Sequence, residues 1–271
     1  MLICEGPVTH GLAIIKKAFR EALDRIDADP DAVEAEGAAC HQAVEQVLNE
    51  EFFKDVLNEI YIISASVDPD SLTLWRNYSG GDGFAIGINS GTTLSADGIA
   101  ESPEAREAEA KDGIPPIGGW YKVHYSDKRK KDLAERFVAD AIEDIKKAAP
   151  SNRRKLMKEQ RKHILILAST MKHKAFKDEK EVRWMTTNWM PVDIMPHGSV
   201  VHYEHTPRGI VPVLHVEAAS EGNNAHLPIR GIRCSPASPA GIERTIEGLL
   251  NQRGYKEASH YVKQSKQPYK G

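Results

Sequence analysis

The fold is decided by the stretch Phe176-Lys177-Asp178-Glu179-Lys180-Glu181-Val182-Arg183-Trp184-Met185. This stretch is predicted to be the strand around which the other elements pack. It places three carboxylates and an arginine at the start of a buried strand. Alternate side chains of a strand share a face, so Glu179, Glu181 and Arg183 are expected on one side. Val182 and Trp184 then lie on the other side, which suits packing on a core.

Two interpretations of this acidic face remain open. Carboxylates one strand repeat apart repel each other, which raises the pKa of one of them toward the range that a general base needs. Alternatively, the stretch is a salt-bridged edge strand in which Arg183 neutralises both acids, since structural ion pairs also perturb pKa values.

Length and composition describe a chain that can bury a core of its own. It has 271 residues, of which 41% are hydrophobic and 28% charged, with a net charge of −3 and a pI near 6.4. Nucleic-acid-binding domains are usually basic, so this balance argues against nucleic acid as a partner. No apolar run reaches the roughly 18 residues of a membrane-spanning helix, and the opening MLICEGPVTHG lacks the features of a signal peptide. We therefore expect a cytoplasmic protein with no membrane partner.

Residue periodicity outward from the acidic stretch predicts strands in groups with helices inserted in blocks. Strands are expected at residues 59–66, 84–89, 120–125, 179–187, 200–205, 209–216, 228–234 and 260–264. Helices are expected at residues 12–26, 44–56, 71–77, 127–149, 151–168 and 238–253. This order predicts an α+β fold with a central mixed or antiparallel sheet, in a single domain over residues 1–271. Residues 1–58 form a helical cover in this prediction, and residues 59–271 form the core.

Three further features of the sequence are candidate sites for a phosphate, a nucleic acid or a metal. The glycine turn at residues 79–83 is either a helix-to-strand corner or a loop that approaches a ligand, and no Gly-Lys-Ser/Thr follows that would make it a phosphate-binding loop. The basic segment at residues 146–162 is interpreted as a solvated helix face. The spacing of His202, Glu204, His205 and His215 around the hairpin fits no tetrahedral site, and three distant cysteines without a CxxC pair argue against a cysteine-based zinc site, so no metal is expected.

Several ordered motifs together resemble the bacterial domain of unknown function 2971 family. They are Ser64-Ala65-Ser66, Leu74-Trp75-Arg76-Asn77-Tyr78, Gly83 to Gly87, Tyr121 to Tyr125, Lys174-Ala175-Phe176, Glu179 to Arg183, Ile229 to Pro236 and Ser265 to Tyr269. The resemblance covers roughly residues 55 to 271. It also implies that the chain lacks the first strands of the family, and Ser235-Pro236 stands where the family usually has Gly-Pro.

At motif level the order Ser-x-Ser followed by Glu-x-Glu is similar to ADP-ribosyltransferases, and the sharper hypothesis is a degenerate or shortened enzyme of that kind that uses NAD. By this analogy Glu181 is the catalytic residue and Glu179 orients the acceptor. A carboxylate near the ribose stabilises the positive charge that develops as nicotinamide leaves. The cofactor-binding candidates are Ser64, Ser66, Trp75, Arg76 and Tyr78.

The alternative hypothesis is a non-catalytic module that binds an unidentified protein or small molecule. In this interpretation Arg76 and Arg183 pair with Asp178, Glu179 or Glu181 to fix the core. The aromatic side chains Trp75, Tyr78 and Trp184 are then packing residues. The two hypotheses differ in what Glu181→Gln does: the module loses stability, whereas the enzyme loses activity and keeps its fold.

Overall fold

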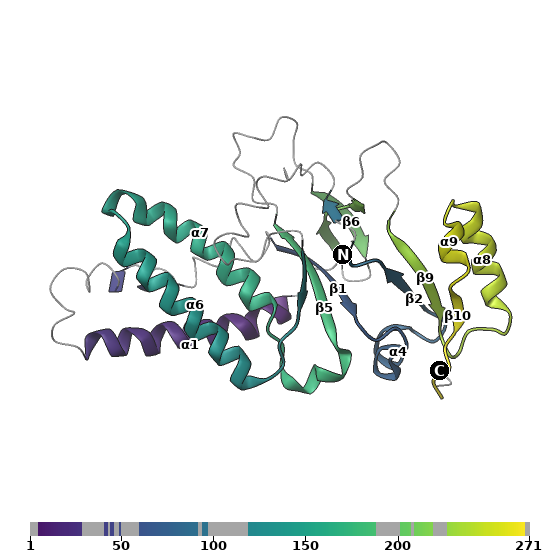
Figure 1. Cartoon of the computed structure of the whole chain (residues 1–271), viewed down its shortest axis with the longest axis horizontal. Coiled ribbons are helices and arrows are strands. Elements are labelled where there is room, and N and C mark those ends of the chain that lie inside the picture. The colour runs from purple at the N-terminus through teal and green to yellow at the C-terminus, as the bar shows by residue number, and fades with distance from the viewer. Residues whose placement is uncertain are drawn as a thin grey trace.

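The computed structural model describes residues 5–28, 41–42, 44–45, 49, 60–91, 94–96, 119–187, 201–206, 209–218 and 227–268. Within these ranges the chain is α+β, as predicted, but its strands form several small sheets in place of one central sheet. Figure 1 shows a group of long helices at one end, the sheets in the middle and two short helices at the other end.

The second half of the acidic stretch, from Glu181 onward, belongs to the middle strand of the first sheet. β5 (Glu181–Thr187) lies between β1 (Ile60–Ser66) and β4 (Gly119–Lys122), and both pairings are antiparallel. The expectation of an edge strand was therefore wrong, because both edges of β5 are occupied. The strand also begins at Glu181, since residues 174–179 form the 3-10 helix η2 (Lys174–Glu179).

Both faces of this sheet are covered. Trp184 is buried with Tyr61 in one apolar cluster, whereas Met185 and Ile60 belong to a larger cluster on the opposite face. Glu181 and Arg183 share the face of Met185, because they alternate with Val182 and Trp184 along the strand. The polar face of β5 is consequently buried as deeply as its apolar face, which the sequence pattern did not indicate.

A bundle of three helices covers the polar face. α1 (Glu5–Asp27) packs against α6 (Asp127–Lys147) and α7 (Pro150–Ser169), and the three run side by side in Figure 1. The buried apolar residues of α1 recur at intervals of three and four: Val8, Leu12, Ile15, Phe19, Ala22 and Leu23. This spacing produces one apolar stripe, which confirms the helix predicted at residues 12–26 and extends it at both ends.

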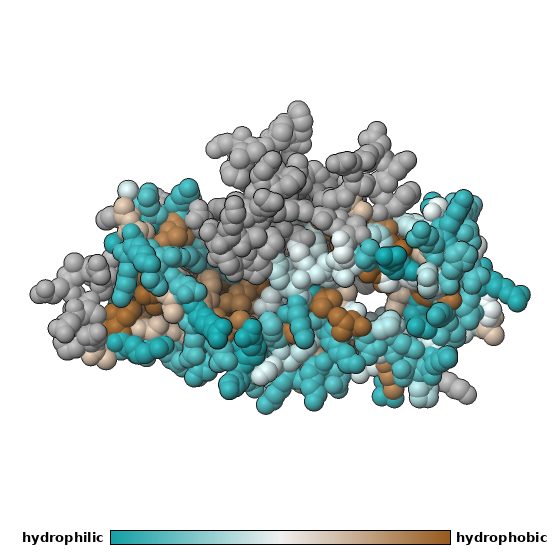
Figure 2. All heavy atoms as spheres, in the orientation of Figure 1, coloured by the Kyte–Doolittle hydropathy of each residue, from teal (hydrophilic) through white to brown (hydrophobic). Residues whose placement is uncertain are grey.

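The second sheet lies toward the end of the molecule that is opposite the helix bundle. β9 (Ile229–Cys234) pairs with β2 (Phe84–Ile88) on one side and in parallel with β10 (Val262–Gln264) on the other. α8 (Ile242–Gln252) and α9 (Lys256–Ser259) pack on it through a third apolar cluster. The short helix α4 (Leu72–Tyr78) connects β1 to β2 and so links the two sheets. In the view of Figure 2, the described surface at the end that carries α8 and α9 is mainly hydrophilic, and hydrophobic residues are visible among the helices at the other end.

Two further strand pairs are short. β3 (Leu94–Ala96) pairs with β8 (Val216–Ala218), and β6 (His202–Thr206) with β7 (Gly209–Val213), which confirms the predicted hairpin. None of the described helices has a stretch both long and apolar enough to cross a membrane.

Several predicted boundaries need correction. The strand predicted at residues 120–125 ends at Lys122, because His124 instead bridges to Met171. The helix predicted from residue 238 begins at Ile242, after Gly241 takes a left-handed conformation. The helix predicted at residues 44–56 lies mostly outside the described residues.

Candidate functional site

The candidate site lies where η2 passes into β5. Lys180, between the two glutamates, has φ of 47° and ψ of 45°, and among the described residues it alone is a non-glycine with positive φ. The left-handed region is costly for a residue with a Cβ, and such residues concentrate at functional sites. The turn at Lys180 lets the carboxylates of Glu179 and Glu181 approach the same cation, although only Glu181 belongs to the strand.

Glu181 is the most heavily bonded carboxylate of the site. Its Oε1 accepts from Arg183 Nε at 2.7 Å, and its Oε2 accepts from Arg183 Nη2 at 3.0 Å. Lys172 Nζ donates to the same Oε2 at 2.8 Å, and Arg183 Nη1 donates to the carbonyl of Ser169 at the end of α7. Arg183 is 1% exposed and Glu181 5%, so this bidentate pair is removed from solvent. The predicted pairing of Arg183 with Glu181 is confirmed.

Lys172 connects the second carboxylate to the first. Its Nζ donates to Glu179 Oε2 at 2.5 Å and lies 4.9 Å from the centre of the Phe176 ring. Arg183 therefore does not neutralise both acids, as one interpretation of the sequence expected, since Lys172 bridges them. Glu179 Oε1 accepts from the Tyr78 hydroxyl at 3.2 Å. The ring of Tyr78 is largely exposed, with 69% of the residue accessible, so this end of the cluster reaches the surface.

The contacts shift the pKa values of the cluster. Burial raises the pKa of Glu181, but the hydrogen bonds and charge of Arg183, with hydrogen bonds from Lys172 and Ser64, outweigh it and bring the pKa to about 2. Burial lowers the pKa of Lys172, but the two glutamates raise it above its ordinary value. Burial of the hydroxyl and the charge of Glu179 raise the pKa of Tyr78. At neutral pH Glu181 and Lys172 are therefore charged and Tyr78 is protonated.

The two serines of β1 lie directly beside β5. The strand register places Ser66 opposite Glu181 and Ser64 opposite Arg183. The side chain of Ser64 hydrogen-bonds Glu181, whereas Ser66 Oγ donates to the carbonyl of Glu179 at 2.7 Å and accepts from the Asp68 amide at 3.0 Å. Ser66 thus fixes the turn, and Ser64 belongs to the carboxylate cluster.

The predicted cofactor-binding residues of α4 separate into different environments. Trp75 is 5% exposed, and its Nε1 donates to Asp70 Oδ1 at 2.8 Å, so its indole is part of the core. Arg76 is exposed, and none of the described carboxylates forms an ion pair with it, which corrects the predicted pairing with the acidic stretch. The third acid of the stretch, Asp178, is likewise exposed in η2. Of the α4 candidates, only Tyr78 contacts the cluster.

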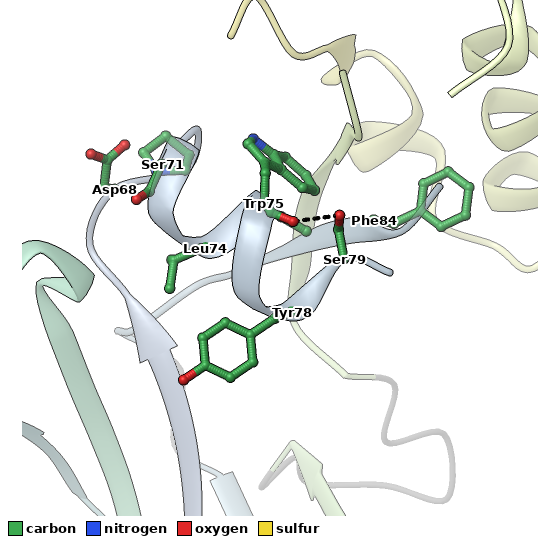
Figure 3. Close-up of a pocket in the computed structure, with 9 residues that line it drawn as sticks. Asp68, Ser71, Leu74, Trp75, Tyr78, Ser79 and Phe84 are labelled. Atoms are coloured by element: carbon green, nitrogen blue, oxygen red, sulfur yellow. Dashed lines mark hydrogen bonds between the residues drawn. The ribbon is translucent and has the colours of Figure 1, made fainter. Parts of the chain in front are cut away.

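A pocket of about 120 Å³ adjoins Tyr78 between α4 and β2. Figure 3 shows that Trp75, Tyr78 and Phe84 extend from its lining in three different directions, so these rings form no aromatic cage. A small-molecule site usually occupies about 300–1,000 Å³. The pocket is therefore smaller than a usual small-molecule site, and Tyr78 is the residue that its lining shares with the cluster.

Asp70 joins the start of α4 to the C-terminal motif. Besides the indole of Trp75, its carboxylate accepts from Ser265 Oγ at 2.5 Å and from the Lys266 amide at 3.3 Å. The side chain of Gln267 donates to the Asp70 carbonyl at 2.7 Å. Residues 265 to 267 therefore act in the fold by holding the segment that carries Trp75 and Tyr78.

Two residues of the cluster were missed by the sequence analysis. Tyr125 accepts a hydrogen bond from the Glu181 amide through its hydroxyl at 2.9 Å, and Lys172 bridges the carboxylates. Charge balance offered a signal for Lys172, because two glutamates and one arginine leave a negative charge that burial does not tolerate. Nothing in the local sequence pointed to Tyr125 as a partner of this amide.

The histidines of the hairpin lie elsewhere. His202 and His215 stack with ring centroids 4.2 Å apart, and His215 contacts Glu204 at 3.1 Å. Among the described residues no group of three or more histidines, cysteines, aspartates or glutamates is arranged to hold a metal ion.

The arrangement defines an α+β protein with a buried, charge-balanced cluster that extends to the surface through the exposed side chain of Tyr78. Both oxygens of Glu181 accept from cations, whereas Glu179 Oε1 accepts from the hydroxyl of the exposed Tyr78. Residues 74–184 match the model of the family described as "Protein of unknown function (DUF2971)", which confirms the resemblance over this segment. The matched segment contains Tyr78, Tyr125, Lys172 and all of the cluster on β5. No curated protein and no solved structure matches the chain.

Proposed function

We propose that the chain is an ADP-ribosyltransferase-like protein that binds NAD, with Glu179 as the carboxylate that meets the ligand. The observation that carries the proposal is the difference between the two glutamates. Glu181 is enclosed by Arg183 and Lys172, whereas Glu179 presents Oε1 toward the exposed Tyr78. A ribose hydroxyl that replaces the Tyr78 hydroxyl would find a carboxylate acceptor there.

The strand arrangement supports this assignment. The Ser-x-Ser strand pairs directly with the Glu-x-Glu strand, and Ser64 hydrogen-bonds the carboxylate of Glu181. The left-handed turn at Lys180 brings the two glutamates together on Lys172, which a regular strand would not do as closely. The pocket beside Tyr78 offers space for one ring of the dinucleotide.

The chemistry assigns a role to each residue. Breaking the bond between nicotinamide and ribose leaves positive charge on the sugar, and the bonding electrons leave with nicotinamide while an acceptor forms the new bond to the same carbon. A carboxylate beside the ribose stabilises this charge. Glu179 supplies the carboxylate, Lys172 holds it in place, and Glu181 with Arg183 keeps Lys172 oriented. Glu181 is then a positioning residue, whereas the sequence analysis expected it to be catalytic.

A second function is favoured by the saturation of Glu181. A network in which every charge has a partner needs no ligand to explain it, and buried ion pairs of this kind fix a core. In this interpretation the chain is a non-catalytic binding module, and Glu179 is a further member of the structural network.

NAD binding by isothermal titration calorimetry, with NAD cleavage followed by release of nicotinamide, tests the proposal. The variants are Glu179→Gln and Glu181→Gln, with Glu257→Gln on the exposed face of α9 as the matched control. We expect the wild type and Glu257→Gln to bind NAD equally. Glu179→Gln should lose cleavage with a smaller fall in its urea midpoint than Glu181→Gln, because Lys172 keeps Glu181 as a partner and the Arg183 pair stays intact.

The outcomes separate the two functions. Binding and cleavage that are lost in Glu179→Gln, with less destabilisation than in Glu181→Gln, support the NAD site. A wild-type chain that binds no NAD, together with a Glu179→Gln variant that is destabilised as much as Glu181→Gln, would leave the structural network as the function of the cluster.

A further inference from the structure

A histidine at the start of the helix bundle accepts a hydrogen bond from a buried lysine. His10 on α1 is half-buried, and its Nε2 lies 3.1 Å from Nζ of Lys130 on α6. Lys130 is 1% exposed and has two other partners, Asp127 Oδ1 at 2.9 Å and the carbonyl of Lys172 at 3.2 Å. The ammonium of Lys130 therefore joins α1, α6 and the turn that carries Lys172.

The direction of this hydrogen bond fixes the state of His10. A lysine ammonium has donors and no acceptor, so Nε2 of His10 must carry its lone pair toward Lys130. The imidazole is consequently neutral, with its proton on Nδ1. Protonation would place a second N–H and a second positive charge against the buried ammonium, so the hydrogen bond would be replaced by repulsion.

We infer that protonation of His10 in mildly acidic solution releases the N-terminal part of α1 from α6. The inference goes beyond the proposed function and does not depend on it, because its elements are the docked helix and the His10–Lys130 contact. This contact would act as a histidine switch, because binding of one proton replaces an attractive contact by a repulsive one.

The groups that face His10 favour this response. α6 contributes Lys130 and Asp127, the turn after α7 contributes His173, whose ring meets His10 edge-on at 5.8 Å, and Lys174 lies behind Asp127 at 3.6 Å. α7 itself meets α1 at Gly11 through Ala168, which carries no charge. Burial, Lys130 and His173 lower the pKa of His10, and the charge of Asp127 opposes them only partly.

The sign of the pH dependence follows from this direction. Above the ordinary pKa of histidine, both the docked and the released helix carry neutral His10, and docking is at full strength. As the pH falls below about 6.5, the released helix binds a proton more readily than the docked one, so docking weakens progressively. Gly11, one residue away, approaches the backbone of Ala168 closely, so release of this part of α1 would separate these two residues.

Two measurements test the inference. The first is hydrogen exchange of the α1 amides between about pH 7.5 and about pH 5, corrected for intrinsic exchange, and the second is the NMR titration of His10. His10→Gln is the decisive variant, because its amide oxygen can accept from Lys130 and does not titrate. His205→Gln, on the exposed hairpin strand β6, is the matched control. Loss of a hydrogen bond to a charged group predicts a fall of about tenfold in protection of the first turns of α1 in the wild type.

The same fall is expected in His205→Gln and none in His10→Gln. The NMR midpoint of His10 in the wild type should lie below about 6.5 and coincide with the change in exchange. Protection of α1 that does not depend on pH in the wild type, or that falls equally in His10→Gln, would overturn the inference. The wild-type titration decides the question even if a variant does not fold.

Discussion

Replacing Glu181 by glutamine is the sharpest test of the cluster, because it removes one charge and keeps the size of the side chain. The change leaves Arg183, which is 1% exposed, without its anionic partner. It also leaves Lys172 with Glu179 as its single anion. The perturbation is therefore electrostatic, with little change in packing volume.

The structure provides the magnitude in two ways. The pKa of Glu181 falls from 4.5 to about 2 in the folded chain. At roughly 1.4 kcal/mol for each pH unit, this difference corresponds to about 3 kcal/mol of stability at neutral pH. Removing one partner of a buried ion pair independently costs about 3–5 kcal/mol. We therefore expect the free energy of unfolding to fall by about 3 kcal/mol.

Urea unfolding followed by circular dichroism measures this loss, with Glu257→Gln on α9 as the control for the substitution itself. The control should lie within about 0.5 kcal/mol of the wild type, as surface substitutions usually do. If Glu181→Gln also unfolds at the wild-type midpoint, Arg183 is not held by this pair, and the account of the cluster as the fixed base of the site is incorrect.

Three further outcomes are expected, one for the pH dependence of the Glu181 pair and two for other contacts. The pKa of Glu181 is lowered in the folded chain, so its contribution to stability is complete above about pH 4.5 and is lost as the pH falls toward about 2. In acid unfolding, the difference in stability between the wild type and Glu181→Gln should therefore shrink over that range. Gly11→Ala would push a Cβ into the carbonyl of Ala168, and thermal unfolding should show a loss of about 2 kcal/mol in stability. The control Gly248→Ala places its Cβ in open space on α8 and should not destabilise the protein. Trp75→Phe removes the indole donor to Asp70 and should cost about 1–2 kcal/mol in urea unfolding, with the C-terminal residues 265–267 losing hydrogen-exchange protection first.

The sequence predicted the cluster in part. The pairing of Glu181 with Arg183 follows from alternation along a strand, which depends on neighbouring residues alone. Glu179 was expected to join them by the same alternation, but it belongs to η2 and reaches the cluster through the turn at Lys180. A left-handed lysine has no sequence signature, because lysine rarely adopts that conformation.

The burial of β5 on both faces shows a second limit of local patterns. A strand with Glu, Glu and Arg on one face is typical of a solvated face, and the edge-strand interpretation rested on that regularity. The face is instead covered by the helix bundle, and Lys172 and Tyr125 supply the missing charge and acceptor. These partners come from segments far along the chain or on the other side of a turn, so their convergence depends on packing.

The sequence by itself determined the α+β class, most of the helices and strands, the hairpin at residues 202–213 and the resemblance that the match at residues 74–184 confirms. Periodicity and turn residues carry this information because secondary structure follows from residues close in the chain. Only the tertiary structure decided that Lys172 joins the two glutamates, that Glu179 is the carboxylate beside the exposed Tyr78, and that His10 accepts from a buried lysine. Each of these depends on groups from separate elements meeting away from water, where an unpaired charge is costly and a partner is therefore required.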